Sequence, residues 1–485
     1  MGRSCLLSIV RCQCVGRGNL ELQYLQQSRH KQELFFGASR PFKGSFSLRF
    51  ANAHEIGRAA FFLGGFVVLT GAFTLQIAGV DPSLPRQFSD GSALSQIITA
   101  TIYLVSLVLF ARTSQPFVTV VRAWPIFLLP VMAFASALWA PDAELTIRRS
   151  FALLGTVLFA LALGSSYTLK DTIRFVLGAL ILVMLLSMIW ATAFPEAGVH
   201  QASDALEPIH AGRWRGVFSH KNSLGAVAGF TLGMLALYGR LVTRSPFLRA
   251  AAMGAATICL TFAGSGTGFV TALNLILIGI LMQLVIRTPL DLRLAVLLLF
   301  TAIVALFFSF ADSAVALALE ALGKSPDLTG RTLYWNYVLS FMGQHWLVGY
   351  GYFSGFLSIG ATIASITSLD LGSTHNGYLD TIVSFGLVGL VVLIFYLCWL
   401  IFQGTRLFLA SNSPSLETTF PICVVFHAIQ LNVVESGFLA ANSLWPLLMA
   451  LAATMLVRVN NSAAGNAAQY GRHRRPNLSP VKVEA

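Results

Sequence analysis

Apolar residues run through most of this chain in stretches of about twenty, each long enough for a helix to cross a hydrocarbon core of about 30 Å. The pattern predicts an all-α polytopic membrane protein with about twelve transmembrane helices. The predicted spans are Ala59–Gly79, Ala93–Ala111, Ala123–Ala140, Ser150–Ser166, Ile173–Phe194, Asn222–Tyr238, Ala250–Ala263, Phe269–Ile286, Leu294–Ala311, Tyr378–Phe402, Phe420–Val434 and Ser443–Val457. The seventh and the eleventh are short, and losing either would invert everything downstream.

Lys and Arg residues between the spans set the expected orientation, because cytoplasmic loops carry an excess of both. With both termini in the cytoplasm, most cations of the short loops fall on the cytoplasmic side, and the acidic residues gather outside. These cytoplasmic cations are Arg112, Arg122, Lys170, Arg174, Arg240, Arg244, Arg249, Arg287, Arg293 and Arg406. The distribution predicts that both termini are cytoplasmic.

The spans divide the chain into a transmembrane domain and two basic cytoplasmic tails. We expect a soluble, mostly disordered extension at residues 1–57, the transmembrane domain at residues 58–459 and a short tail at residues 460–485. Two outer, periplasmic segments are longer than the other connections, residues 195–221 and residues 312–377. Long loops on a rigid scaffold usually carry binding or catalytic residues, so function is expected there.

The larger outer loop contains a predicted amphipathic helix. Apolar and aromatic residues recur at helical spacing from Tyr334 to His345. Asp327 or Thr329 would cap the start of this helix, and the glycines after Val348 would end it. Its aromatic face suits the membrane interface or the outer surface of the bundle. The alternative is a helix that only closes the end of the bundle.

Composition agrees with the hydrophobic pattern. Of 485 residues, 56% are hydrophobic and 11% are charged, and the mean hydropathy of +0.73 lies outside the range of soluble domains. The net charge of +12 is concentrated in the terminal tails, so it does not indicate a nucleic-acid partner. Basic cytoplasmic tails fit anionic membrane lipids, since each Lys or Arg near the surface contributes about 1 kcal/mol.

Basic residues in the outer segments run against the topological bias and suggest an anionic ligand. Arginine can hold a phosphate through two parallel N–H groups, whereas lysine offers a point charge. The stretch "GRWRGVFSHKN" places three such cations before the sixth span, and "TGRTLYW" places Arg331 near helix-start N–H groups that also favour an anion. The candidates are Arg213, Arg215, Lys221, Arg331, Arg148 and Arg149. For the last three, the alternative is a side chain that reaches the lipid headgroups.

A possible proton acceptor precedes the tenth span in "STHNGYLDTIVSFGLVGL". His375 is a suitable base near neutral pH, although a lone histidine at a helix start is more often structural. Glu435, just beyond the eleventh span, is an alternative base, because a carboxylate at that depth is costly without a task or partner. Asp370 and Asp380 flank His375 and are candidates to orient it. The sequence leaves the choice between His375 and Glu435 open.

Metal, nucleotide and hydrolase motifs are not expected. His200, His210 and His220 share one outer loop, but their ten-residue spacing fits no short metal-ligand motif. The chain offers no phosphate-binding loop and no nucleophile elbow in a credible context. We therefore expect neither a metal nor another cofactor.

Four motifs in this order resemble the O-antigen ligase and polymerase superfamily: "ALWAPDAELTIRRS", "GRWRGVFSHKNSLG", "TGRTLYWNYV…GYGYFSGF" and "THNGYLDTIVSFGLVGL". The resemblance covers about residues 133–457 and is closest to exopolysaccharide polymerases of the ExoQ type. In one respect the chain departs from the pattern: "FAGSGTGFVTAL", between the seventh and eighth spans, lacks an arginine expected nearby. If a third arginine is required, Arg148 or Arg149 would supply it.

The resemblance implies an inner-membrane glycosyltransferase whose active site faces the periplasm. Such an enzyme moves a saccharide from undecaprenyl diphosphate to a hydroxyl, without nucleotide sugar or essential metal. Carried onto this chain, the diphosphate-binding arginines match Arg213 or Arg215 and Arg331, and the loop histidine matches His375 in "HNGY". Nearby residues expected to bind saccharide are Trp335, Asn376 and Tyr378, although core packing is the alternative for any single aromatic residue. We expect one in-line displacement with inversion at C1.

Three functions remain open at this point. Polymerisation of lipid-linked repeat units of an exopolysaccharide or O-antigen is favoured over ligation of a finished chain to lipid A–core. A transporter of the lipid-linked oligosaccharide is the alternative from another class, but it should place more ionisable groups inside the spans. Expected partners are the undecaprenyl-diphosphate-linked oligosaccharide and membrane lipids, with a chain-length regulator and a flippase as further candidates.

Overall fold

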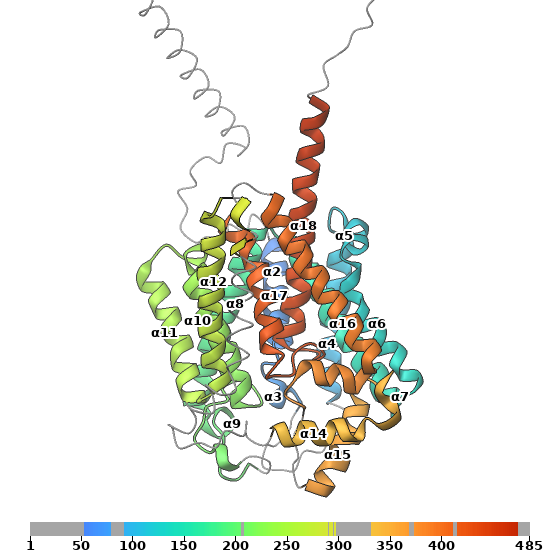
Figure 1. Cartoon of the computed structure of the whole chain (residues 1–485). Coiled ribbons are helices and arrows are strands. Elements are labelled where there is room, and N and C mark those ends of the chain that lie inside the picture. The colour runs from blue at the N-terminus through green and yellow to red at the C-terminus, as the bar shows by residue number, and fades with distance from the viewer. Residues whose placement is uncertain are drawn as a thin grey trace, which may run out of the picture. The chain divides into compact units, whose positions relative to one another are not determined.

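The computed structural model describes residues 53–78, 92–204, 208–289, 291–293, 295–296, 331–367, 373–410 and 415–473, all within one compact unit, Phe50–Ala485. These residues form helices and no β-strand; Val199 and Trp214 pair in an isolated antiparallel bridge (Figure 1). The chain is therefore an all-α polytopic membrane protein, as the hydrophobic pattern predicts. The extension predicted for residues 1–57 lies almost entirely outside the described residues.

Among the described residues, seven helices are long and apolar enough to cross a membrane. They are α4 (Ala93–Ala111), α7 (Ala143–Ser166), α8 (Leu169–Ala193), α10 (Lys221–Val242), α11 (Pro246–Ala263), α12 (Gly266–Arg287) and α16 (Gly377–Ala410). A further pair of segments, α5 (Pro116–Arg122) and Trp124–Leu138, which includes α6 (Leu128–Ala135), is bent by 77° and forms either a broken span or a re-entrant loop. A proline at position 125 follows the break, consistent with an interrupted helix.

The other predicted spans are shorter helices or lie outside the described residues. The first corresponds to α2 (Ala53–Leu69) followed by α3 (Thr74–Ala78). The eleventh corresponds to α17 (Leu416–Leu431), and the twelfth to the apolar start of α18 (Leu444–His473). The ninth, Leu294–Ala311, is almost entirely undescribed. The total of twelve spans and the location of the termini stay predictions.

Small residues allow the central helices to approach closely. α10 packs against both α11 and α12. A Cβ added at Gly229 of α10 would lie 2.0 Å from the carbonyl oxygen of Gly268 in α12, so the two backbones meet where neither has a side chain. Helices in membranes associate through such contacts, because burial of apolar surface drives little association between helices in lipid.

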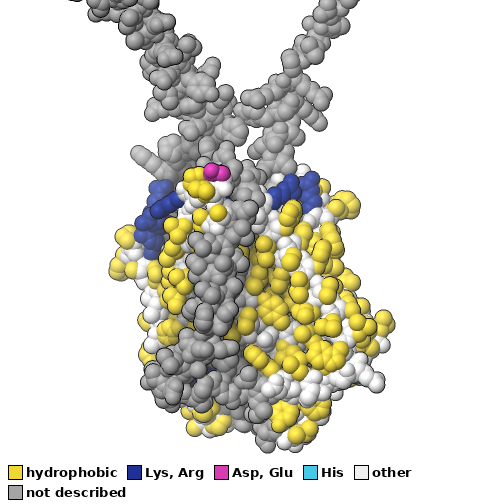
Figure 2. Space-filling view, viewed as in Figure 1, with side chains coloured by type: hydrophobic (Ala, Val, Ile, Leu, Met, Phe, Trp, Pro, Cys, Tyr) yellow, Lys and Arg dark blue, Asp and Glu magenta, His cyan; other side chains and the backbone are white. Residues whose placement is uncertain are grey.

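The two ends of the bundle differ in charge and structure. Figure 2 shows Lys and Arg side chains gathered at one end, while apolar side chains cover the flanks. Arg122, Arg240 and Arg287 lie in the last turns of α5, α10 and α12, which end there. At the opposite end lie α9 (Pro195–Gly198), α14 (Arg331–Phe341) and α15 (Ser354–Thr367) (Figure 1).

α16 is broken at Gly386, inside the predicted span Tyr378–Phe402, where the sequence predicted a continuous helix. Gly386 has φ 66° and ψ −159°, which is not helical, and the part before it lies across the end of the bundle (Figure 1). The segment 347–351 crosses the break: Tyr350 and Gly351 N–H groups donate to the carbonyls of Val383 and Ser384, at 2.8 and 3.0 Å. These bonds satisfy carbonyls that the break leaves without helical partners.

The predicted amphipathic helix exists as α14, but two of its expected features are wrong. The helix ends at Phe341, and a 3₁₀ turn (Gly343–Trp346) follows, so it stops before the glycines after Val348. Its face of Tyr334, Val338 and Met342 is buried, where membrane-interface exposure was expected. This face packs against α15 and the first part of α16 in a core of its own. α15 was not predicted from the sequence.

Candidate active site

His375 and Glu435 form a pair at the end of the bundle that carries α14. His375 Nδ1 lies 3.3 Å from Glu435 Oε2, and their side chains are 25% and 16% exposed. A carboxylate accepts hydrogen bonds, so in the neutral imidazole Nδ1 carries the proton and Nε2 keeps its lone pair. Nε2 makes no hydrogen bond to the described part of the chain. The arrangement provides a partly accessible base with a carboxylate behind it.

The start of α16 fixes the segment that carries His375. Asn376 Oδ1 accepts the N–H groups of Tyr378 and Leu379, both at 3.0 Å, and so caps the helix. The N–H of Gly377 donates to the backbone carbonyls of Asn432 and Glu435, at 2.8 and 3.0 Å. A Cβ at Gly377 would lie 2.0 Å from Asn432 Oδ1, so this close contact requires glycine. These bonds hold the His375 and Glu435 segments together.

Asn432 organises the turn that presents Glu435. Its side chain is fully buried, and Oδ1 accepts the N–H groups of Gly437 and Phe438, at 2.7 and 2.9 Å. Its amide group donates to the carbonyl of Ala428 at 2.8 Å. The sequence reading missed this residue. The sequence feature that could have indicated it is an asparagine at the end of an apolar run, three residues before Glu435. At such a position a side-chain oxygen can replace hydrogen bonds that are lost where the helix ends.

The three predicted saccharide-binding residues surround His375, and each bonds to protein. Trp335 Nε1 donates to the carbonyl of Thr374 at 2.7 Å. Tyr378 donates its hydroxyl to the carbonyl of Ile429 at 2.9 Å and packs edge-on against Phe438. Asn376 uses its oxygen for the cap, and its amide N–H groups make no hydrogen bond to the described residues. Polar groups near His375 thus serve first to build the loop.

Arg215, a predicted diphosphate ligand, is buried in the loop before α10. Its side chain is 2% exposed and pairs with Asp204 at 3.0 Å. Nε and Nη2 donate to the carbonyls of Ala197 and Glu196, at 2.8 and 3.0 Å. Burial lowers the pKa of the Arg215 guanidinium, and Asp204 opposes that shift. All three nitrogens therefore bond to protein.

His200 completes this buried network. Its Nε2 accepts the backbone N–H of Lys221 at 3.1 Å, so Nδ1 carries the proton and donates to Asp204 at 3.0 Å. Burial lowers the pKa of His200 to about 4, with the Asp204 carboxylate acting against the shift. Its ring packs edge-on with His210 and His220. Within the described residues, no group of His, Cys, Asp or Glu side chains is arranged to hold a metal ion.

Arg213, two residues before Arg215, is exposed. Its guanidinium covers Gly264, in the turn between α11 and α12: a Cβ at Gly264 would lie 2.6 Å from Arg213 Nη1. Gly264 also has φ 58°, a conformation that favours glycine. The turn is part of "FAGSGTGFVTAL", the stretch that lacks an arginine of its own. The loop before α10 thus supplies a guanidinium there.

The remaining predicted cations are spread over the same end of the bundle. Arg148 and Arg149 lie within the second turn of α7, which begins seven residues before the predicted span. Arg148 pairs with exposed Glu144 at 3.9 Å, and the Arg149 guanidinium lies 4.1 Å from the ring centre of Phe353. Lys221 Nζ bonds to Asn222 Oδ1 at 3.2 Å. Arg331 is the first residue of α14.

A family model described as O-antigen ligase matches residues 250–394. This match supports the resemblance of the chain to the O-antigen ligase and polymerase superfamily. The match begins in α11 and ends in α16, so it contains Arg331 and His375, and the structure adds Glu435 from outside it. No curated protein matches the chain. Closeness to polymerases of the ExoQ type stays a prediction.

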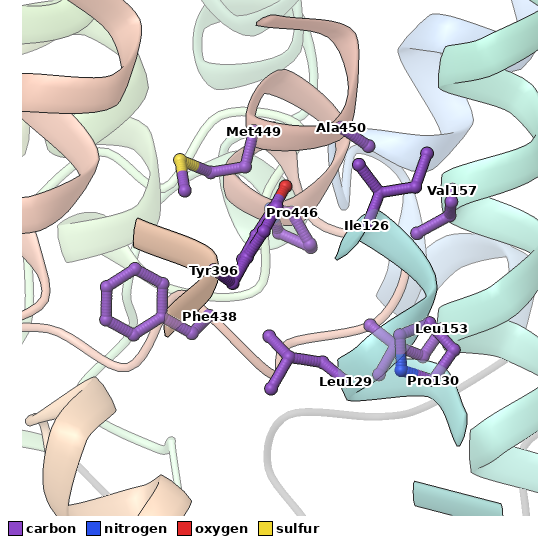
Figure 3. A pocket seen from close by; sticks show the side chains of 10 residues that line it. All are labelled: Ile126, Leu129, Pro130, Leu153, Val157, Tyr396, Phe438, Pro446, Met449 and Ala450. Carbon is purple, nitrogen blue, oxygen red and sulfur yellow. The ribbon is translucent and has the colours of Figure 1, made fainter. Parts of the chain in front are cut away.

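The protein also has an apolar cavity between α6, α7, α16 and α18 (Figure 3). Leu129, Leu153, Val157 and Met449 are among its lining residues. Phe438, which packs against Tyr378, connects its wall to the turn that carries Glu435. A diphosphate would lose its hydration there without a compensating charge, so the cavity is not a site for that group.

Proposed function

We propose that this membrane enzyme polymerises undecaprenyl-diphosphate-linked oligosaccharide repeat units of an exopolysaccharide or O-antigen. The observation that carries the proposal is the His375–Glu435 pair. The His375 side chain is partly exposed, and its Nε2 makes no hydrogen bond to the described residues. The pair includes a residue of the matched segment, and exposed Arg213 lies at the same end of the bundle. A base and a cation are the two groups that glycosyl transfer from a diphosphate requires.

In the proposed reaction His375 is the general base. Nε2 takes the proton of the acceptor hydroxyl while that oxygen forms a bond to C1 of the donor saccharide. The bond between C1 and the diphosphate oxygen breaks with inversion, and undecaprenyl diphosphate leaves with the electron pair. A positioned base typically contributes about 10²–10⁴-fold. Glu435 keeps Nδ1 as the donor and stabilises the imidazolium that forms.

Arg213 and Arg331 are the proposed ligands of the diphosphate. Arg213 is exposed beside the α12 N-terminus, and Arg331 opens α14 in the matched segment. Negative charge grows on the leaving diphosphate, so fixed cations stabilise the transition state more than the ground state; one such donor is worth about 2.7–4 kcal/mol elsewhere. Arg215 is not among the proposed ligands, because its nitrogens bond to Asp204 and to two backbone carbonyls.

The charge of the two ends supports a periplasmic active site in the bacterial inner membrane. Arginines gather at the end opposite His375, and basic residues favour the cytoplasmic side. The proposed site would then face the periplasm. The saccharide there would arrive on its lipid carrier, so the reaction needs no nucleotide sugar.

Ligation to lipid A–core is the second candidate, favoured by the description of the matched family as O-antigen ligase. The test is reconstitution of the purified protein with the lipid-linked repeat unit alone, and then with lipid A–core added. Longer saccharides from the carrier alone support polymerisation, and product only with lipid A–core supports ligation. Absence of product in both reactions would contradict the proposal and favour transport.

A further inference from the structure

Thr374, the residue before His375, is fully buried and held through every polar group it has. Its carbonyl accepts the indole N–H of Trp335 at 2.7 Å. Its N–H donates to Asp380 Oδ1 at 3.2 Å, and its hydroxyl contacts the same oxygen. The hydroxyl also lies 2.8 Å from the carbonyl of Asn376. The N–H of Asn376 donates to the same hydroxyl at 3.2 Å, so five polar contacts converge on one residue.

His375 itself has a positive φ. Its φ is 52°, in the left-handed region that few residues other than glycine enter, although histidine is enriched there together with asparagine and aspartate. Such a conformation costs about 1–3 kcal/mol and persists where surrounding contacts impose it. On one side of His375 these contacts come from Thr374, and on the other from the bonds of Gly377 to the Asn432 and Glu435 carbonyls.

We propose that Trp335 and Asp380 are positioning residues that act on His375 through Thr374. The inference rests on the proposed function, since it concerns the same reaction. Trp335 comes from α14 and Asp380 from the first turn of α16, so the clamp fixes the histidine segment to the small core that these helices share with α15. The bound conformation directs Nδ1 towards Glu435 and leaves Nε2 for the acceptor hydroxyl.

The clamp also gives Trp335 a role that differs from saccharide stacking. Its indole N–H is engaged by the Thr374 carbonyl, and its ring packs against the core of α14 and α15. Loss of that N–H should therefore disturb the histidine and leave donor binding intact. A displacement of about 1 Å at a reacting group can cost about 10²-fold in rate.

The test is the variant Trp335→Phe, which keeps an aromatic ring and removes the indole N–H. Tyr337→Phe is the matched control, because it removes one polar group from the same helix without touching Thr374. We expect kcat on the lipid-linked repeat unit, per folded enzyme, to fall about 10- to 100-fold in Trp335→Phe. KM for the donor should stay within about twofold, and Tyr337→Phe should match wild type.

Thr374→Val and Thr374→Ser form a second pair. Valine removes the hydroxyl at nearly constant volume, and serine restores it, so serine should recover most of the kcat that valine loses. A raised KM with unchanged kcat in Trp335→Phe would overturn the positioning role in favour of saccharide binding. Wild-type kcat in both Trp335→Phe and Thr374→Val would overturn it outright. An inactive wild-type enzyme would instead contradict the proposed function.

Discussion

Two histidine–carboxylate pairs in this protein use the same chemical groups for different purposes. His200 and Asp204 are 3.0 Å apart, with side chains 4% and 9% exposed. His375 and Glu435 are 3.3 Å apart, with side chains 25% and 16% exposed. In each pair Nδ1 faces the carboxylate, so that contact does not distinguish them.

The second ring nitrogen makes the difference. In His200 it accepts the N–H of Lys221, and Arg215 also bonds to the Asp204 carboxylate, which completes a closed network. In His375 the second nitrogen has no hydrogen-bond partner among the described residues, and the side chain reaches the surface. A saturated, buried pair stabilises a loop, whereas a pair with an accessible lone pair can accept a proton.

Replacement of His375 should have the largest effect. We expect His375→Ala to lower kcat by about 10²–10⁴-fold, because the acceptor hydroxyl loses its base. The melting temperature in detergent should change little, since the ring is partly exposed. Turnover of the lipid-linked repeat unit by purified protein measures this effect. Turnover within about threefold of wild type would exclude His375 as the base.

Arg215→Met should instead lower stability. Removing the cation leaves Asp204 buried beside His200, and breaking a buried ion pair typically costs about 3–5 kcal/mol. Thermal unfolding in detergent measures the loss, while turnover per folded enzyme should stay close to wild type. If stability is retained and turnover is lost, Arg215 acts in the reaction and the comparison fails.

Arg213→Met is the matched variant two residues away. Arg213 is exposed, so the melting temperature of the variant should stay close to that of wild type. Turnover should fall by about 10²–10³-fold if the Arg213 guanidinium stabilises the leaving diphosphate. Wild-type turnover in Arg213→Met would remove this residue from the diphosphate site. The two variants together distinguish an arginine that acts in the reaction from an arginine that stabilises the fold of the same loop.

The smallest expected effect is the contribution of His200 to the pH dependence of the free energy of unfolding. Burial lowers its pKa to about 4, against about 6.5 in an unfolded chain. Between these two pH values the unfolded chain binds more protons than the folded one. The contribution of His200 to folded-state stability is therefore complete above about pH 6.5 and declines as pH falls towards 4. The slope from this group is at most about 1.4 kcal/mol per pH unit. Melting curves of wild type and His200→Gln should therefore converge as pH falls; parallel curves would contradict this role.

The sequence predicted much of the fold, because the hydrophobic pattern is strong. α4 has the predicted bounds, and α8, α10, α11 and α12 differ from prediction by a few residues. The break at Gly386 was not predictable, since apolar residues continue across it and its cause is a contact with the distant segment 347–351. The buried face of α14 depends likewise on α15.

For the candidate site, residue types were predictable and their partners were not. Arg213 and Arg215 are equivalent in the motif "GRWRG", and only the fold buries one and exposes the other. His375 and Glu435 were rival bases in the sequence, and the structure places them within hydrogen-bond distance although they lie 60 positions apart. Asn432, which holds the turn of Glu435, lacked any motif of its own.

The most direct test of the account is a double-mutant cycle on kcat with His375→Ala, Glu435→Gln and the combined variant. Groups that act as one unit are strongly non-additive. We predict that Glu435→Gln alone slows turnover by more than about tenfold and that the combined variant is no slower than His375→Ala. A loss of kcat in the combined variant equal to the product of the two single losses would show that the residues act independently, which would contradict a catalytic pair.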